Sequence, residues 1–142
     1  MQLMISSLKW FVFGLLFLLT GACQKDTAKP VPSLLGRWNA VAGAEYEYNR
    51  DDKLLAQHTY PPQPEPYYML ITQDSLKYIS LLNSGSLGKY KIIRQGDMIQ
   101  LIRGRVNPLI TKLTAESLIL RFPKAVILAS GNYIDIEDHY SR

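Results

Sequence analysis

The sequence predicts an all-β domain, a small antiparallel up-and-down barrel of about eight strands, preceded by a short non-globular segment. From residue 34 onward apolar residues recur with a period of two, the spacing of a strand with one buried face. Turn-forming residues interrupt this pattern every 8–12 residues or so, which is typical of a sandwich or barrel. The chain has 142 residues and is 47% hydrophobic, so it is long enough for one domain and too apolar for disorder.

Residues 1–22 have the pattern of an export signal. Lys9 is their one charged residue, an uncharged apolar run covers residues 10–19, and the small residues 20–22 follow. Charge, apolar run and small residues in this order are typical of a signal peptide. The run is also shorter than the ~20 apolar residues that a membrane span needs.

Cys23 is the only cysteine of the chain, so no disulfide can form within one molecule. Residues 19–23, Leu-Thr-Gly-Ala-Cys, resemble the bacterial lipobox, in which a signal peptidase cuts just before a diacylated cysteine. The resemblance implies that Cys23 is the lipidated first residue of the mature protein. Thr20 departs from it, because leucine is commonest at that place. The alternative is a cysteine that lies by chance near an ordinary cleavage site.

Residues 23–34 are expected to be the lipidated cysteine and a flexible tether, because they are polar, contain two prolines and lack an apolar period. The barrel domain then covers residues 35–142. Residues 24–26, Gln-Lys-Asp, resemble a signal that directs some Gram-negative lipoproteins to the outer face of the cell, although an ordinary spacer explains them equally well. We expect a lipid-anchored protein of the bacterial cell envelope, at the periplasmic or surface face of the outer membrane.

The first strand is the longest of the predicted set. Its inward face is expected to comprise Trp38, Ala40, Ala42, Ala44, Tyr46 and Tyr48. Asn and Asp residues at 49–52 predict a turn, and residues 53–60 a return strand. Residues 61–66 contain four prolines, which remove four backbone donors, so this segment is predicted to be a loop.

The remaining pattern predicts a series of short strands joined by turns. Residues 95–97, Gln-Gly-Asp, predict a tight hairpin, and residues 83–86, 114–117 and 131–132 predict further turns or breaks. In the strand before the hairpin, Tyr90 is expected to point inward. The expected strands cover residues 67–72, 76–81, 88–94, 98–103, 109–113, 118–122, 125–128 and 133–137.

Gly36-Arg37-Trp38, at the start of the first strand, matches the Gly-x-Trp signature of lipocalins. Residues 34–42 resemble the opening of bacterial lipocalin-like domains, and the likeness extends to residue 142. Its other supporting segments are residues 88–90, 96–99 and 110–121. The resemblance implies a lipocalin- or calycin-like up-and-down barrel, whose better-known relatives hold small apolar ligands.

The same resemblance implies a structural role for Trp38. Its indole would lie across the closed end of the barrel, beneath an arginine from near the end of the chain, either Arg121 or Arg142. Gly36 would let the chain turn tightly before it. The domain is shorter than a typical lipocalin and shows no amphipathic helix after the last strand. In barrels of this size, side chains fill the interior or leave room for one small ligand.

Few residues suggest catalysis, metal binding or nucleic-acid binding. The net charge is +4 with scattered basic residues, whereas a nucleic-acid surface usually needs a dense basic patch. The two histidines lack a metal-binding spacing, and no phosphate loop or nucleophile elbow is present. Glu45 and Glu47 are expected on the outer surface, and residues 137–139 at a solvated chain end. We therefore expect a non-enzyme without cofactor, metal or nucleic-acid partner.

Two functions of different class fit these observations. Tyr46, Tyr48, Tyr78 and Tyr90 could line a cavity in which a membrane-tethered module binds a small apolar or amphipathic molecule. Alternatively these tyrosines plug a narrow barrel, and the protein is a structural or interaction module that contacts an envelope protein. The proline-rich loop would then suit such a contact, because it loses little entropy on binding.

The lipid anchor can be tested by replacing Cys23 with Ser. Wild-type protein should incorporate a fatty-acid label and stay with the membrane, because a diacylglycerol plus an amide-linked chain supplies several acyl anchors. The Cys23→Ser variant should lose both properties. Equal labelling and equal membrane retention of the two proteins would disprove the lipobox interpretation.

Overall fold

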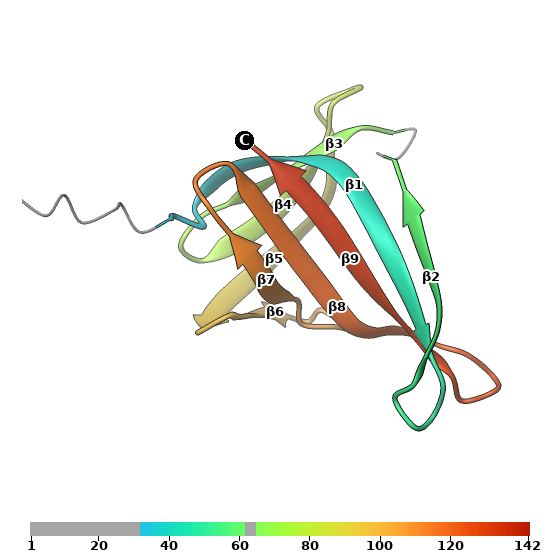
Figure 1. The fold of residues 1–142 in the computed structure, drawn as a ribbon. Coiled ribbons are helices and arrows are strands. Elements are labelled where there is room, and N and C mark those ends of the chain that lie inside the picture. Colours follow the sequence, from blue (N-terminus) through green and yellow to red (C-terminus); the bar gives the residue numbers. More distant parts are fainter. Residues whose placement is uncertain (1–31, 62–64) are drawn as a thin grey trace, which may run out of the picture. The chain divides into compact units, whose positions relative to one another are not determined.

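The computed structural model describes residues 32–61 and 65–142, which form an antiparallel β domain (Figure 1). The expected export signal, Cys23 and most of the tether lie outside the described residues. No helix in the described part is long and apolar enough to cross a membrane. The strands are β1 (Gly36–Tyr48), β2 (Leu54–Tyr60), β3 (Tyr67–Ile71), β4 (Ser75–Ser80), β5 (Ser86–Gln95), β6 (Met98–Ile102), β7 (Leu109–Leu113), β8 (Ser117–Ile127) and β9 (Tyr133–Ser141).

Strand β1 closes the sheet into a barrel because it pairs with both ends of the strand series. Its first residues, 36–39, pair with β3, and residues 39–48 pair with β9. Strands β3 to β9 follow one another in sequence order, so eight strands form the closed wall. This confirms the predicted all-β, up-and-down barrel.

The ninth strand, β2, lies outside the closed wall, next to the second half of β1. Gly43 of β1 pairs with Tyr60 of β2, and Asn39 pairs with Tyr68 of β3. Asn39 and Gly43 are four positions apart on β1, whereas their partners Tyr68 and Tyr60 are eight positions apart. The proline-containing segment 61–66, of which residues 62–64 lie outside the described residues, accounts for the excess, since proline cannot donate to the ladder.

A register shift between Ala40 and Ala42 in the β1–β9 pairing decides which side chains of β1 face the interior. It inserts Val41 as an unpaired residue, and such a bulge exchanges the two faces of the strand beyond it. Trp38 is buried inside before the bulge, whereas Tyr46 pairs with Asp135 after it, on the outer face of β9.

The expectation that Tyr46 and Tyr48 share the inward face of Trp38 is therefore wrong. The same bulge corrects the placement of Glu45 and Glu47. Glu45 pairs with Ile136, which faces the barrel interior, and directly paired residues lie on the same face of a sheet.

The hydrophobic core is formed by residues from Leu34 to Tyr140. Leu34, which was expected to end the tether, is buried and belongs to the domain, so the domain begins before residue 35. Because the barrel buries its apolar face with its own residues alone, this part of the chain can fold by itself. The buried cluster consists of Leu34, Trp38, Met69, Ile71, Leu76, Ile92, Ile99, Leu101, Ile110, Leu118, Leu120 and Tyr140.

Trp38 closes one end of the barrel and is fully buried. Its indole N–H donates to the carbonyl of Leu34 at 2.8 Å, and the Arg142 guanidinium carbon lies 4.0 Å from the ring centroid. Arg142 also donates to the carbonyls of Ser33 and Leu35. These hydrogen bonds connect the segment before β1 to the residue after β9. Of the two arginines expected near this ring, the structure places Arg142 over it.

Gly36 precedes the tryptophan in a backbone conformation, φ +120°, that residues with a side chain rarely adopt. This agrees with the tight turn that the sequence predicts before the first strand.

The last two strands differ in length from the predicted ones. Strand β8 joins the segments 118–122 and 125–128 through a register shift that accommodates Pro123. Strand β9 continues to Ser141, so residues 137–139 pair with β1 and β8 and do not form the solvated chain end that was expected. Strands β1, β2, β8 and β9 extend past the remaining strands as a ribbon (Figure 1).

Burial of Trp38 predicts a large loss of stability in a Trp38→Ala variant of residues 24–142. The free energy of unfolding should fall by about 3–5 kcal/mol, because a large apolar side chain leaves a cavity behind. Urea titration followed by circular dichroism measures this change. Leu82→Ala serves as the control, since Leu82 is 67% exposed and should have an effect within about 0.5 kcal/mol. Equal stability of Trp38→Ala and wild type would contradict the closed-end packing.

Candidate ligand-binding cavity

The barrel has a cavity of about 480 Å³, open to solvent, toward the end away from Trp38. Strands β4, β5, β6, β8 and β9 contribute to its wall, and the loop between β6 and β7 contributes to its rim. Side chains therefore leave this end of the barrel open. The lining residues are Tyr78, Tyr90, Leu101, Arg103, Gly104, Arg105, Val106, Phe122, Ala125, Ile136 and Asp138.

Tyrosine rings form one side of this cavity. Tyr78 and Tyr90 meet edge to face with their ring centroids 6.4 Å apart. Tyr78 also meets Tyr67 edge to face at 5.8 Å, and Tyr67 meets Tyr140 in the same way at 6.4 Å. Gly88 is the partner of Tyr78 on β5, and it leaves space for the ring of Tyr90. Two of the four tyrosines singled out in the sequence, Tyr78 and Tyr90, thus lie at the cavity.

Asp138 places a carboxyl group in this wall. The Tyr140 hydroxyl donates to its Oδ2 atom at 3.2 Å. Burial raises the pKa of Asp138, while the Tyr140 hydrogen bond and the neighbouring His139 act in the opposite direction. Among the described residues the ion pairs join Arg121 to Asp135 and His139 to Glu137, so Asp138 has no cationic partner there.

A glycine lets a further tyrosine approach Asp138 from the ribbon. Gly43 pairs with Asp138 on one side and with Tyr60 on the other. A Cβ atom at Gly43 would lie 2.3 Å from the Tyr60 ring, so the ring lies directly over the glycine backbone. Burial, followed by the charges of Asp138 and Glu45, raises the pKa of Tyr60 to about 12. Tyr60 therefore lies close to two carboxylates.

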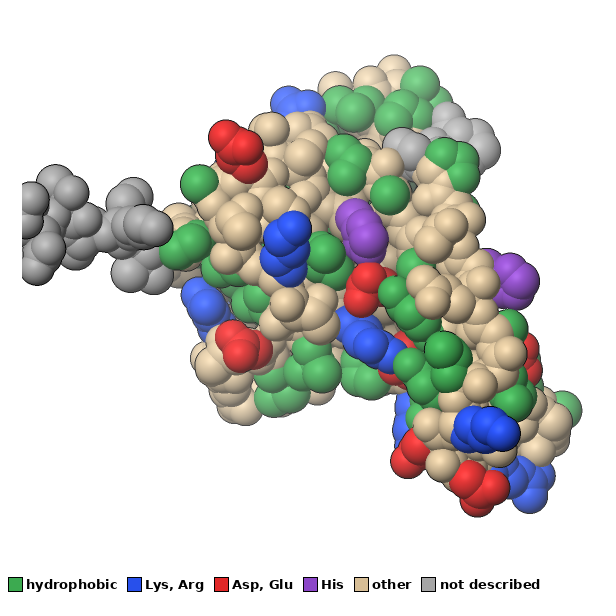
Figure 2. Space-filling model, in the orientation of Figure 1, with side chains coloured by type: hydrophobic (Ala, Val, Ile, Leu, Met, Phe, Trp, Pro, Cys, Tyr) green, Lys and Arg blue, Asp and Glu red, His purple; other side chains and the backbone are tan. Residues whose placement is uncertain are grey.

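The rim of the cavity carries two arginines, Arg103 and Arg105, which are exposed. Arg103 has a φ of +67°, in the left-handed region that ordinary side chains rarely adopt. Elsewhere the surface is mixed in charge, and Figure 2 shows acidic and basic side chains interspersed on one face of the molecule.

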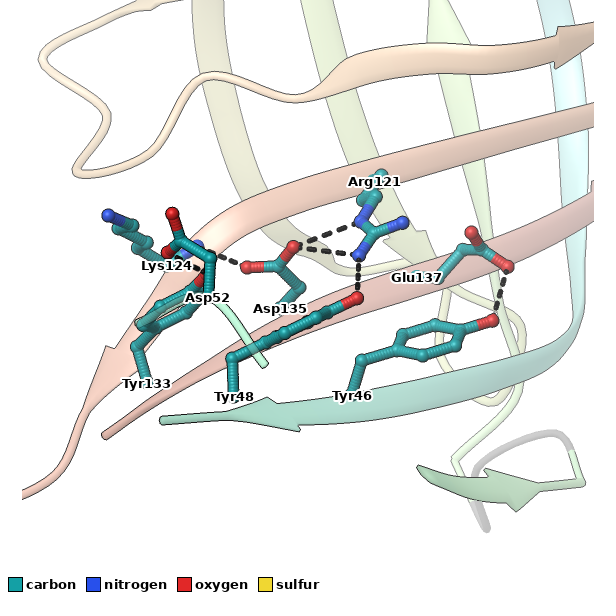
Figure 3. A network of polar contacts seen from close by, with 8 residues as sticks. All are labelled: Tyr46, Tyr48, Asp52, Arg121, Lys124, Tyr133, Asp135 and Glu137. Carbon is teal, nitrogen blue, oxygen red and sulfur yellow. Dashed lines mark hydrogen bonds and ion pairs between the residues drawn. The ribbon is translucent and has the colours of Figure 1, made fainter. Parts of the chain in front are cut away.

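Tyr48 belongs to a polar network on the outer face of the ribbon (Figure 3). Asp135 is buried and accepts hydrogen bonds from Arg121 Nε at 3.0 Å and from the Lys124 backbone N–H at 2.7 Å. Arg121 also donates to the Tyr48 hydroxyl at 2.7 Å, and the rings of Tyr48 and Tyr133 stack at 5.2 Å. The network lies on the outer face of the sheet, where it holds the part of β8 that contains the register shift between Phe122 and Val126.

Tyr46 lies in the same outer network. Its hydroxyl donates to Glu137 at 3.3 Å, and the Arg121 guanidinium lies 5.0 Å from its ring centroid. Tyr46 and Tyr48 thus support the outside of the wall and do not line the cavity. Arg121, one of the two arginines considered for Trp38, is also part of this support.

Asp138, Tyr60, Tyr67 and Tyr140 are site residues that were not singled out in the sequence. For Asp138 a signal was available, because Ile134, Ile136, Asp138 and Tyr140 continue the period-two pattern of the last strand. No cluster of potential metal ligands occurs within the residues that the structure describes.

Comparison of the chain with protein-family models, with curated proteins and with solved structures finds no match. The fold and the geometry of the cavity are therefore the observations from which a function can be inferred.

The raised pKa of Asp138 predicts how stability depends on pH in an Asp138→Asn variant. A carboxyl whose pKa is higher in the folded than in the unfolded protein destabilises the fold as pH rises through the folded pKa. The variant should therefore unfold at a higher urea concentration than wild type at about pH 7. This difference should shrink toward about pH 3.5, where the unfolded carboxyl is also protonated.

Asparagine keeps an oxygen that can accept the Tyr140 hydrogen bond, so the comparison isolates the charge. Asp97→Asn, at an exposed hairpin position, is the matched control for the removal of one negative charge. A constant difference between Asp138→Asn and wild type across this pH range would contradict the raised pKa.

Proposed function

We propose that this chain is a membrane-anchored lipocalin-like protein that binds a small apolar or amphipathic molecule in the open end of its barrel. The observation that carries the proposal is the cavity of about 480 Å³. Small-molecule sites range over roughly 300–1,000 Å³ and combine apolar walls with a few polar groups. A cavity of this size favours a binding module over the alternative of a filled barrel.

The lining is chemically suited to an amphipathic ligand. Leu101, Val106, Phe122 and Ile136 supply apolar surface, while Tyr78 adds a polar hydroxyl to an aromatic ring. Aromatic rings with polar tips give contact area and orient a ligand at the same time. The lining is mostly apolar and aromatic, which suits the binding of a ligand, so we propose binding and no catalysis.

The closed end supports the lipocalin-like part of the proposal. Gly36, Trp38 and Arg142 come together as the Gly-x-Trp resemblance implies, with the guanidinium over the indole. Because fold alone does not determine function, this arrangement supports the kind of barrel, and the cavity supports the ligand.

The anchor is the second part of the proposal and rests on the sequence. A lipid on Cys23 and a polar tether up to about residue 33 would hold the barrel close to the membrane surface. The protein would then act in the bacterial envelope, at the outer membrane, where an amphipathic ligand can reach it from the lipid phase or from the aqueous phase.

Ligand binding can be measured with an environment-sensitive fatty-acid probe added to residues 24–142. We expect saturable binding that weakens about tenfold in a folded Tyr90→Ala variant, because the ring forms part of the cavity wall. Tyr46→Ala is the matched control and should bind as wild type does, since Tyr46 lies on the outer face. Absence of saturable binding, or equal losses in the two variants, would refute the cavity as the binding site.

A further inference from the structure

We infer that the cavity binds an amphipathic molecule through an ammonium group, held between the Asp138 carboxylate and the surrounding tyrosine rings. The inference rests on the proposed function and adds the chemical class of the ligand. Its basis is the juxtaposition, in one cavity wall, of two tyrosine rings, apolar side chains and the Asp138 carboxylate, which has no cationic partner among the described residues.

The first step concerns charge. Asp138 lines the cavity, and the Tyr140 hydroxyl binds its Oδ2, which leaves Oδ1 without a hydrogen bond among the described residues. Glu45 lies on the same face of the sheet, opposite Ile136 on β9 and His58 on β2, outside the cavity lining. A partly buried carboxylate is costly unless it is paired, and a cationic ligand would provide the missing partner.

The contrast with Asp135 strengthens this step. Asp135 is buried nearby on the same strand, and it accepts from Arg121 and from a backbone N–H. The barrel thus provides a cation for the acidic residue that supports its wall, whereas the one in its cavity has none among the described residues. Among these residues no fully buried side-chain polar atom lacks a hydrogen-bond partner, so the second oxygen of Asp138 is accessible and a ligand can reach it.

The second step concerns the aromatic rings. Tyr78 and Tyr90 line the cavity together with Asp138, and Tyr140 donates to the Asp138 carboxylate. Burial, followed by charges that include that of Asp138, raises the pKa of Tyr60, Tyr67, Tyr78 and Tyr140. Aromatic rings stabilise a cation through their negative faces, and proteins use such rings to recognise ammonium groups. The two tyrosines of the cavity wall and the Asp138 carboxylate therefore favour the same ligand charge.

The third step concerns the opposite charge. A ligand carboxylate or phosphate at Asp138 would be repelled by that group, so it cannot take the ammonium position. Arg103 and Arg105 lie at the rim, where they are exposed and leave the interior apolar. The apolar part of the ligand then lies against Leu101 and Phe122.

Calorimetric titration of residues 24–142 with three probes of equal chain length tests this inference. Octylammonium, octanol and octanoate share an alkyl chain and differ in charge. We expect octylammonium to bind at least about tenfold more tightly than octanol, and octanoate to bind more weakly than octylammonium. An Asp138→Asn variant should lose this preference for octylammonium and keep its affinity for octanol.

Two further variants keep the result interpretable. Asp97→Asn removes one negative charge at an exposed hairpin, so it should retain the full preference for octylammonium. Glu45→Gln alters a residue of the ribbon outside the core and should lower octylammonium affinity by a smaller factor. Circular dichroism verifies that each variant is folded, and Glu45→Gln still tests the inference if Asp138→Asn is not.

The possible outcomes separate the inference from the proposed function. Binding of octanol or octanoate as tight as that of octylammonium would overturn the ammonium site and leave the binding function intact. Unchanged preference in both folded Asp138→Asn and Glu45→Gln would overturn it too. If none of the three probes bound, the proposed function itself would fail.

Discussion

The antiparallel pairing of β1 with β9 is the constraint on which the other features of the domain depend. It closes the barrel, and it does so with one extra residue, Val41, on the β1 side. Because of that residue the tyrosines of β1 turn outward and Glu45 turns inward. The inward position of Glu45 and the aromatic character of the outer network thus arise from the same irregularity.

The two ends of the barrel differ in how tightly they are packed and in how their polar groups are paired. At the Trp38 end, the indole is fully buried, its N–H has a partner, and Arg142 donates to two backbone carbonyls. At the Asp138 end, a cavity remains, and a partly buried carboxyl has no cationic partner among the residues that the structure describes. Natural proteins commonly give up stability in this way at functional sites, while the rest of the fold compensates.

Much of the fold was predictable because local patterns encode it. The hairpin at residues 95–97 and the alternation around Tyr90 depend on neighbours in the sequence, and the structure has both. The bulge at Val41 depends on the partner strand, and nothing in the alternating sequence of β1 reveals it. Without this bulge, the alternating pattern predicts the wrong face of the sheet for Tyr46 and Tyr48. Asp138 was overlooked because an acidic residue near the end of a chain usually lies in solvent, whereas pairing with two strands holds it inside.

Closure by strands far apart in the chain also affects the order of folding. The contacts between β1 and β9 join residues separated by 91 and 102 positions. Loop-closure entropy delays such contacts, so domains that rely on them fold slowly compared with domains rich in local contacts. During synthesis β1 can pair early with β2 and β3, but its other edge stays open until β9 has emerged. The indole of Trp38, at the beginning of the first strand, gains its guanidinium cover only after nearly the whole domain has been made.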